Sequence, residues 1–213
     1  LGVHTIGDLA AMPLLTLRRL FGVYGESLHR WANAHGASPV LPPGRPKSIS
    51  RESTFPQDTR DPALLWGTLR YLAERVGADL RQEGMVARRV VTKIRWEEFV
   101  TITRHHTLPG PMDTDDLIFR AGEALLLREL EKAPGRQVRL LGIGVGQLAP
   151  RPPQAALLEE GRERRLARAL DALREKYGYG AVQRGLTLSL NGRFPQEKGP
   201  SIRLALHPLP HTR

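Results

Sequence analysis

The chain contains no cysteine and no apolar run that approaches the roughly 20 residues of a membrane span. Without cysteine, structural disulfides and cysteine-ligated zinc are both excluded. Without a long apolar run or a charged and apolar leader, we expect no membrane segment, no signal peptide and a cytoplasmic location. Because the first residue is Leu1, we expect the 213 residues to be part of a larger protein.

Acidic residues are also few: 22 Asp and Glu stand against 32 Lys and Arg, which gives a formal net charge of +10. Such an excess predicts an anionic partner, either nucleic acid or a membrane surface. Arg outnumbers Lys, which together with the lack of cysteine fits a GC-rich genome or a thermophile, and both remain open.

What the sequence does contain is a clear strand pair at 87–107, with a tight turn at Glu97-Glu98. Successive side chains of a strand point to opposite faces. One face therefore carries Val90, Thr92, Ile94 and Trp96, and the other carries Arg89, Lys93 and Arg95 around Val91, with Thr101, Thr103, His105 and Thr107 on the partner strand. Cations and hydroxyl groups together suit a phosphate backbone. An ordinary half-exposed antiparallel sheet has the same pattern.

The pair lies inside an alternation of strands and helices that predicts an α+β fold. A strand is expected from Lys47 to Phe55, a helix from Pro62 to Gly84, a second helix after Asp113–Asp116, and a last strand at 137–145. The order β-α-β-β-α-β is a split-βαβ arrangement, with two helices behind a four-stranded sheet.

The segments on either side differ from this unit. At the N-terminus, Thr5 and Asp8 form a predicted capping box, and a Gly22–Gly25 hairpin between two helices could offer backbone N–H groups to an anion. Consecutive prolines predict an extended linker at 41–46. Beyond 148, we expect an amphipathic helix at 162–177 with Leu166, Leu170, Leu173 and Tyr177 on one stripe, and short strands at 186–190 and 202–206.

Four motifs in one order carry a resemblance to a known family. They are Leu20-Phe-Gly-x-x-Gly25, Lys47-Ser-Ile-Ser-x-Glu52-x-Thr-Phe55, Lys93-Ile-Arg95-x-x-x-Phe99-x-Thr-x-Thr-Arg104 and Val138-Arg-Leu-Leu-Gly142. From Leu1 to about Gly185 the chain resembles the C-terminal half of a Y-family DNA polymerase of the bacterial DNA polymerase IV (DinB) class. The resemblance implies a partial thumb of helix-hairpin-helix form at 1–40, a linker at 41–46, a little finger at 47–147 and a tail at 148–213.

The resemblance also implies functional residues and partners. It assigns DNA contacts to Gly22, Gly25, Lys47, Arg51, Lys93, Arg95, Thr101, Thr103 and Arg139. The implied partner is primer-template DNA, gripped without sequence preference by a monomer that acts in translesion synthesis and DNA repair. The segment Gln154-Ala-Ala-Leu-Leu158 falls where family members carry a sliding-clamp peptide, so Gln154, Leu157 and Leu158 are candidate clamp contacts. It departs from the family pattern, because Ala155 replaces a leucine and Leu158 a phenylalanine.

Catalytic residues are not expected in this chain. Nucleotidyl transfer needs Mg²⁺ held by converging carboxylates, which the family carries in a palm domain upstream of Leu1. Hence the chain needs no cofactor of its own and should be inactive alone. We interpret Asp113, Asp115 and Asp116 as the start of a helix, and His105-His106 lacks metal-ligand spacing because strand neighbours point apart.

Two alternative functions remain open at this stage, and so does the role of one aromatic pair. A non-catalytic adaptor that binds DNA or the clamp and recruits another polymerase would differ in the sequence that precedes Leu1. An RNA-binding split-βαβ domain would need exposed aromatic residues on its sheet, where this sequence places Arg, Lys and Thr. Tyr24 and Trp31 could stack on a base, although aromatic residues beside a helical hairpin belong more often to a core.

Overall fold

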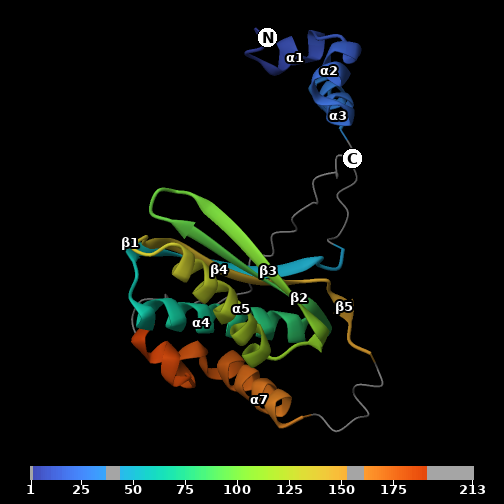
Figure 1. The fold of residues 1–213 in the computed structure, drawn as a ribbon. Helices are drawn as coiled ribbons and strands as arrows, with labels where there is room; N and C mark the ends of the chain where they lie inside the picture. Colours follow the sequence, from blue (N-terminus) through green and yellow to red (C-terminus); the bar gives the residue numbers. More distant parts are fainter. Residues whose placement is uncertain (1, 37–43, 153–160, 191–213) are drawn as a thin grey trace. The chain divides into compact units, whose positions relative to one another are not determined.

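The computed structural model describes residues 2–36, 44–152 and 161–190, and it divides the chain into two compact units, Leu1–Gly44 and Arg45–Arg213 (Figure 1). The division falls within the proline-rich segment that the sequence predicts as a linker. Among the helices of the described ranges, none has both the length and the apolar character needed to cross a bilayer.

The first unit consists of three short helices. These are α1 (Ile6–Ala11), α2 (Leu14–Phe21) and α3 (Val23–Ala32). The predicted capping box is present, since the Asp8 N–H donates to Thr5 Oγ1 at 3.1 Å and the Thr5 N–H donates to Asp8 Oδ2 at 2.9 Å. It satisfies two backbone donors that the first turn of α1 leaves without helical partners.

Two glycines set how α2 meets α3. Gly22 joins the helices with φ of +59°, a value that side chains disfavour. Gly25 lies in the first turn of α3, where a Cβ atom would overlap the backbone carbonyl of Leu17 in α2. The predicted hairpin is thus a single residue, and Gly25 permits the close crossing of the two helices.

The second unit has the predicted β-α-β-β-α-β order. Its elements are β1 (Ser48–Thr59), α4 (Pro62–Gln82), β2 (Met85–Trp96), β3 (Thr101–Met112), α5 (Asp115–Lys132) and β4 (Val138–Gly146). The strands pair antiparallel in the order β1-β4-β2-β3, and the short β5 (Ala149–Pro150) pairs with β2. Both strands of the predicted hairpin are longer than expected, because β2 begins at Met85 and β3 continues past Thr107 to Met112.

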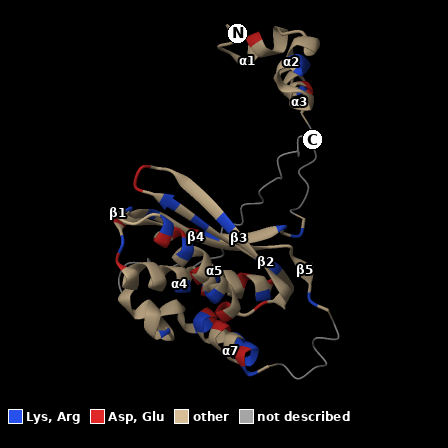
Figure 2. Ribbon diagram, in the orientation of Figure 1, with Lys and Arg blue, Asp and Glu red and all other residues tan. Residues whose placement is uncertain are grey.

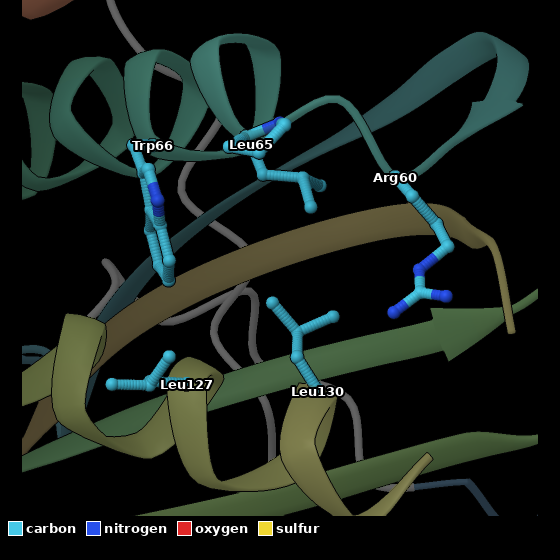
Figure 3. A pocket seen from close by; sticks show the side chains of 6 residues that line it. Arg60, Leu65, Trp66, Leu127 and Leu130 are labelled. Carbon is cyan, nitrogen blue, oxygen red and sulfur yellow. The ribbon is translucent and has the colours of Figure 1, made fainter. Parts of the chain in front are cut away.

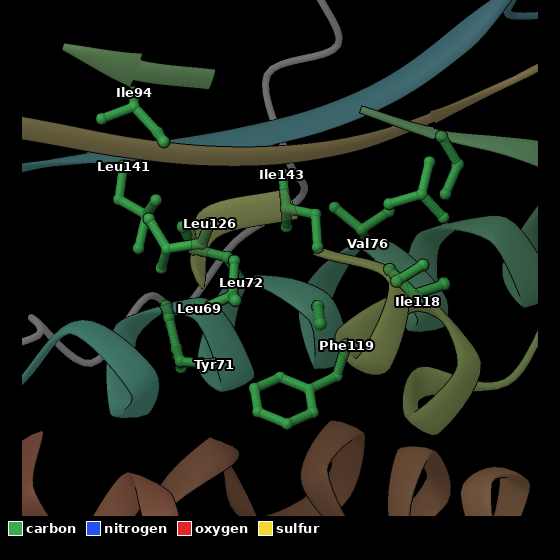
Figure 4. Close-up of a cluster of buried hydrophobic side chains, with 14 of the residues drawn as sticks. Leu69, Tyr71, Leu72, Val76, Ile94, Ile118, Phe119, Leu126, Leu141 and Ile143 are labelled. Atoms are coloured by element: carbon green, nitrogen blue, oxygen red, sulfur yellow. The ribbon is translucent and has the colours of Figure 1, made fainter. Parts of the chain in front are cut away.

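Helices α4 and α5 cover one face of this sheet and bury the main core (Figures 1 and 4). The sheet contributes Val90, Ile94, Trp96, Leu141 and Ile143, and the helices contribute Leu69, Leu72, Val76, Ile118 and Leu126. The alternation predicted for β2 is confirmed, since Val90, Thr92, Ile94 and Trp96 are each no more than 1% exposed.

The C-terminal segment forms a third layer beneath α4 (Figure 1). It comprises α7 (Arg162–Tyr177) and two 3₁₀ helices, η1 (Tyr179–Ala181) and η2 (Gly185–Leu190). The predicted helix at 162–177 is confirmed, whereas the predicted strand at 186–190 is wrong. Gly67 of α4 admits η2, because a Cβ atom there would lie 2.7 Å from the Leu186 carbonyl oxygen. The expected strand at 202–206 lies outside the described residues.

Charged side chains hold this third layer, and Figure 2 shows both signs together where α7 approaches α4. The central group is the fully buried carboxylate of Glu74, which Arg70 contacts at 2.9 Å, Arg174 at 2.8 Å and the Tyr179 hydroxyl at 2.5 Å. Burial, together with the neighbouring Glu74 charge, raises the pKa of the Tyr179 phenol. The hydroxyl therefore stays protonated and donates to the carboxylate.

A second charged contact lies further along α4. Arg81 reaches Asp115 of α5 at 2.8 Å and Asp171 of α7 at 2.6 Å, so one guanidinium joins three helices. These polar contacts explain why α7 does not pack through the predicted stripe of Leu166, Leu170, Leu173 and Tyr177. Its buried residue is Ala167, while Leu166 and Tyr177 are 51% and 61% exposed.

Candidate nucleic-acid interface

The face of the sheet opposite α4 and α5, here called the open face, is defined by strand register. Residues directly opposite one another on neighbouring strands point to the same side of a sheet. Lys93 is opposite Gly142 and Thr103, and Gly142 is opposite Glu52. The four strands contribute Ser48, Ser50, Glu52, Thr54, Leu140, Gly142, Gly144, Gly146, Arg89, Val91, Lys93, Arg95, Thr101, Thr103, His105 and Thr107.

The predicted group Lys93, Arg95, Thr101 and Thr103 is thus brought together on this face. Arg95 Nε donates to Thr101 Oγ1 at 2.8 Å, which holds the guanidinium along β3. Lys93 Nζ lies 2.7 Å from the Glu52 carboxylate, with the two side chains 35% and 50% exposed. Arg89 joins these cations at the other end of β2. The predicted contacts did not include Arg89, although the alternation along β2 already placed it on this face.

Glycines line the middle of the open face along β4. A Cβ atom on Gly142 would lie 3.0 Å from Cβ of Glu52, and one on Gly144 would lie 2.7 Å from Cβ of Ser50. The side chains of β1 therefore lean over β4. Consequently the polar groups of β1 and β2 approach one another across a strand that contributes little side-chain bulk of its own.

Arg51 does not lie on this face beside Lys93, although the family resemblance assigns both residues to DNA contact. Its role in DNA contact remains a prediction. Arg51 is opposite Ile143, whose side chain lies in the core, and its guanidinium contacts Asp79 of α4 at 2.9 Å. The physical reason is the alternation of β1: Ile49 packs towards the core, so Arg51, two residues later, points the same way.

The other predicted contacts of the second unit occupy separate positions. Arg139 pairs with Asp58 at 2.7 Å and lies over the Phe99 ring, with 4.2 Å from its guanidinium carbon to the ring centroid. Lys47 is exposed immediately before β1. Their predicted roles in DNA contact remain predictions.

In the first unit, Gly22 and Gly25 shape the helix crossing, and their own N–H groups donate within it. The Gly22 N–H donates to the Arg18 carbonyl oxygen at 2.8 Å, and the Gly25 N–H donates to that of Gly22 at 3.0 Å. Tyr24 and Trp31 contact each other edge to face and are 51% and 53% exposed. The expectation that this aromatic pair belongs to a core is therefore wrong.

The acidic residues in 113–116 mark the start of α5 as interpreted, with Asp115 and Asp116 in its first turn, and they also make ion pairs. Asp113 contacts Arg164 at 2.7 Å, and Asp116 contacts Arg70 at 2.6 Å. Burial raises the pKa of Asp115 despite the Arg81 charge beside it. Burial also acts to raise the pKa of Asp116, but hydrogen bonds and charges from Arg70 and Arg184 outweigh it and lower that pKa. These carboxylates serve the contacts between α4, α5 and α7.

Metal ligands are not grouped anywhere in the part of the chain that the structure describes. His105 lies on the open face opposite Val91, and His106 lies on the helix side opposite Val90, as strand alternation predicts. The candidate clamp contacts Gln154, Leu157 and Leu158 lie outside the described residues.

An apolar groove opens at the end of the helix layer, away from the open face (Figure 3). It has a volume of about 310 Å³ and is lined by Arg60, Pro62, Leu65, Trp66, Leu127 and Leu130. Its lining carries one cation and no carboxylate, so the groove offers no acid–base pair for chemistry.

Comparison with known proteins identifies the family. Residues 46–158 match the impB/mucB/samB family C-terminal domain, which is more than half of the 213-residue chain. A protein named DNA polymerase IV from Dehalococcoides mccartyi is 38% identical over 196 residues, which is 91% of this chain and 50% of the relative. A DNA polymerase IV 1 from Bacillus subtilis is 33% identical over 88% of this chain and 47% of its own length.

A solved structure gives the same fold. A Y-family DNA polymerase chimera (Dbh–Dpo4–Dbh) superimposes with a TM-score of 0.52 at 20% sequence identity, over 70% of this chain and 42% of the chimera. The chain spans about half the length of the curated relatives it matches. It belongs to the impB/mucB/samB family, and it corresponds to the C-terminal region, little finger included, of the relatives named DNA polymerase IV.

Proposed function

We propose that this chain binds duplex or primer-template DNA by its phosphate backbone, through the open face of the sheet. The observation that carries the proposal is the gathering of Arg89, Lys93 and Arg95 with the hydroxyl groups of Thr101 and Thr103 on the face opposite α4 and α5. Lys and Arg contribute charge and counterion release, and Thr contributes hydrogen bonds to phosphate oxygens.

The same face lacks aromatic side chains for RNA recognition by stacking, and it lacks the amide side chains that read adenine. None of the open-face residues defined above is Phe, Tyr or Trp, the side chains on which unpaired bases stack. Asn and Gln, which read adenine in the major groove, are also missing from that set. DNA binding with little sequence preference fits these residues best.

Replacing Lys93 and Arg95 with alanine tests the proposal. Each substitution removes one cation from the open face, so each should weaken binding similarly on unrelated duplex sequences. Each should also lower the slope of log affinity against log salt by about one. The measurement is fluorescence anisotropy with labelled primer-template DNA at several salt concentrations.

A matched control is Lys132→Ala, which removes the same charge from the C-terminal end of α5 in the helix layer. If Lys132→Ala lowers affinity as much as Lys93→Ala, the attraction comes from overall charge and the open face has no special role. Strong preference for one sequence would also contradict the proposal.

Within a complete polymerase, this region would hold the primer-template while an upstream palm performs nucleotidyl transfer. The relatives' names support this assignment, because each is called a DNA polymerase IV. Magnesium chemistry belongs to that upstream part, where converging carboxylates would hold the ions. Binding of the sliding clamp by Gln154, Leu157 and Leu158 remains a prediction from the sequence.

A further inference from the structure

The Glu52–Lys93 ion pair crosses an entire strand. Glu52 is on β1 and Lys93 on β2, and Gly142 of β4 lies between them in register. Because Gly142 has no side chain, the lysine and glutamate side chains meet above it at 2.7 Å. The pair therefore lies on the surface proposed to receive DNA.

Lys93 is paired with a carboxylate, and in this it differs from Arg89 and Arg95, the other cations of the open face. Arg95 uses a neutral partner, the Thr101 hydroxyl, and keeps its full positive charge available to a phosphate. Within residues 2–36, 44–152 and 161–190, neither Arg89 nor Arg95 has a carboxylate at ion-pair distance. Glu52 is also the one carboxylate among the open-face residues.

We propose that Glu52 is an electrostatic brake on DNA binding, an inference that rests on the proposed function of the open face. In the free protein, Glu52 neutralises Lys93. When DNA binds, Lys93 must leave the carboxylate for a phosphate, and Glu52 then remains as an unpaired negative charge beside the DNA backbone. Glu52 thus lowers affinity and speeds release of DNA.

The exchange is physically feasible because both side chains are at least partly exposed to solvent. Exposed ion pairs are weak, since water and salt screen the attraction. A phosphate on duplex DNA is a better partner, because neutralising it releases condensed counterions. The cost that remains is the repulsion between Glu52 and neighbouring phosphates, and this cost disappears when the carboxylate is replaced by an amide.

Glu52→Gln in the 213-residue chain tests the brake, because it keeps the shape of the side chain and removes its charge. We expect affinity for primer-template DNA to rise roughly threefold to tenfold at moderate salt, mainly through slower dissociation. The slope of log affinity against log salt should change by less than about one, because Lys93 reaches a phosphate in both proteins.

Glu131→Gln provides the control, since Glu131 is exposed on α5 in the helix layer and its replacement changes net charge equally. The brake is overturned if Glu52→Gln leaves affinity unchanged, lowers it, or raises it no more than Glu131→Gln does. A fall in affinity would instead make Glu52 a positioning residue for Lys93. The proposed function has a separate test: it is contradicted if the Lys93→Ala and Arg95→Ala variants bind DNA as the original chain does.

Discussion

A Glu74→Ala variant is expected to lose about 3–5 kcal/mol of unfolding free energy, because it removes one partner from a buried network of charges. Arg70 would keep its charge at a side-chain exposure of 3%, and Arg174 at 8%, without the carboxylate that both contact. The Tyr179 hydroxyl would lose its acceptor as well. The C-terminal layer should therefore detach first.

Urea unfolding measures the loss, and hydrogen exchange locates it. We expect exchange to accelerate most in α7 and η2, and less in the strands. Glu131→Ala removes an exposed glutamate from α5 and should change stability by no more than about 0.5 kcal/mol. If Glu74→Ala costs under about 1 kcal/mol, the contacts between Glu74 and its donors do not hold the layer in place.

Trp96→Ala should destabilise the second unit by about 3–5 kcal/mol, which is typical of a large aromatic residue removed from a core. The Trp96 ring is 1% exposed, and it lies on the helix side of β2 beneath the Arg136 guanidinium, 4.9 Å from the ring centroid. Its loss leaves a cavity at the end of the strand, where the register between β2 and β4 shifts.

The neighbouring residue provides a matched control in the same strand. Arg95→Ala changes the open face, so it should leave stability within about 0.5 kcal/mol while weakening DNA binding. Thermal and urea unfolding of both variants, with DNA titrations of each, separate the two faces. Equal destabilisation by the two substitutions would contradict the assignment of Trp96 to the core and Arg95 to the open face.

Much of the second unit could be predicted from local pattern. The alternation of Val90, Ile94 and Trp96 against Lys93 and Arg95 identified both faces of β2. The helices α4 and α5 followed from apolar spacing and from their acidic or proline starts. Such signals depend only on residues close in sequence, which explains why they were sufficient.

The position of Arg51 could also have been found. In β1 the residues Ser48, Ser50, Glu52 and Thr54 are all polar, and Ile49 is the apolar exception among its neighbours. That pattern places the odd-numbered residues towards the core and leaves Glu52 on the open face. The family resemblance grouped Arg51 with Lys93 and Arg95, whereas the periodicity of β1 places its side chain on the helix side of the sheet.

The third layer could not be predicted, because its contacts join residues that are far apart in the chain. Tyr179 and Glu74 are 105 residues apart, and Arg81 and Asp171 are 90 apart. The leucine stripe of α7 predicted an amphipathic helix that packs through leucines. In the structure, Ala167 is the buried residue of α7, and ion pairs such as Arg81–Asp171 join the helix to α4. Composition alone does not reveal which of many charges will pair.

The absence of cysteine allows a direct test of where DNA lies. A single cysteine introduced at Thr103, on the open face, can be labelled with a photoactivatable cross-linker, and Glu131→Cys places the same label on the helix layer. Both variants are irradiated with the same primer-template DNA at matched occupancy. We predict strong cross-linking from position 103 and background from position 131, whereas equal yields, or a higher yield from position 131, would contradict DNA binding by the open face.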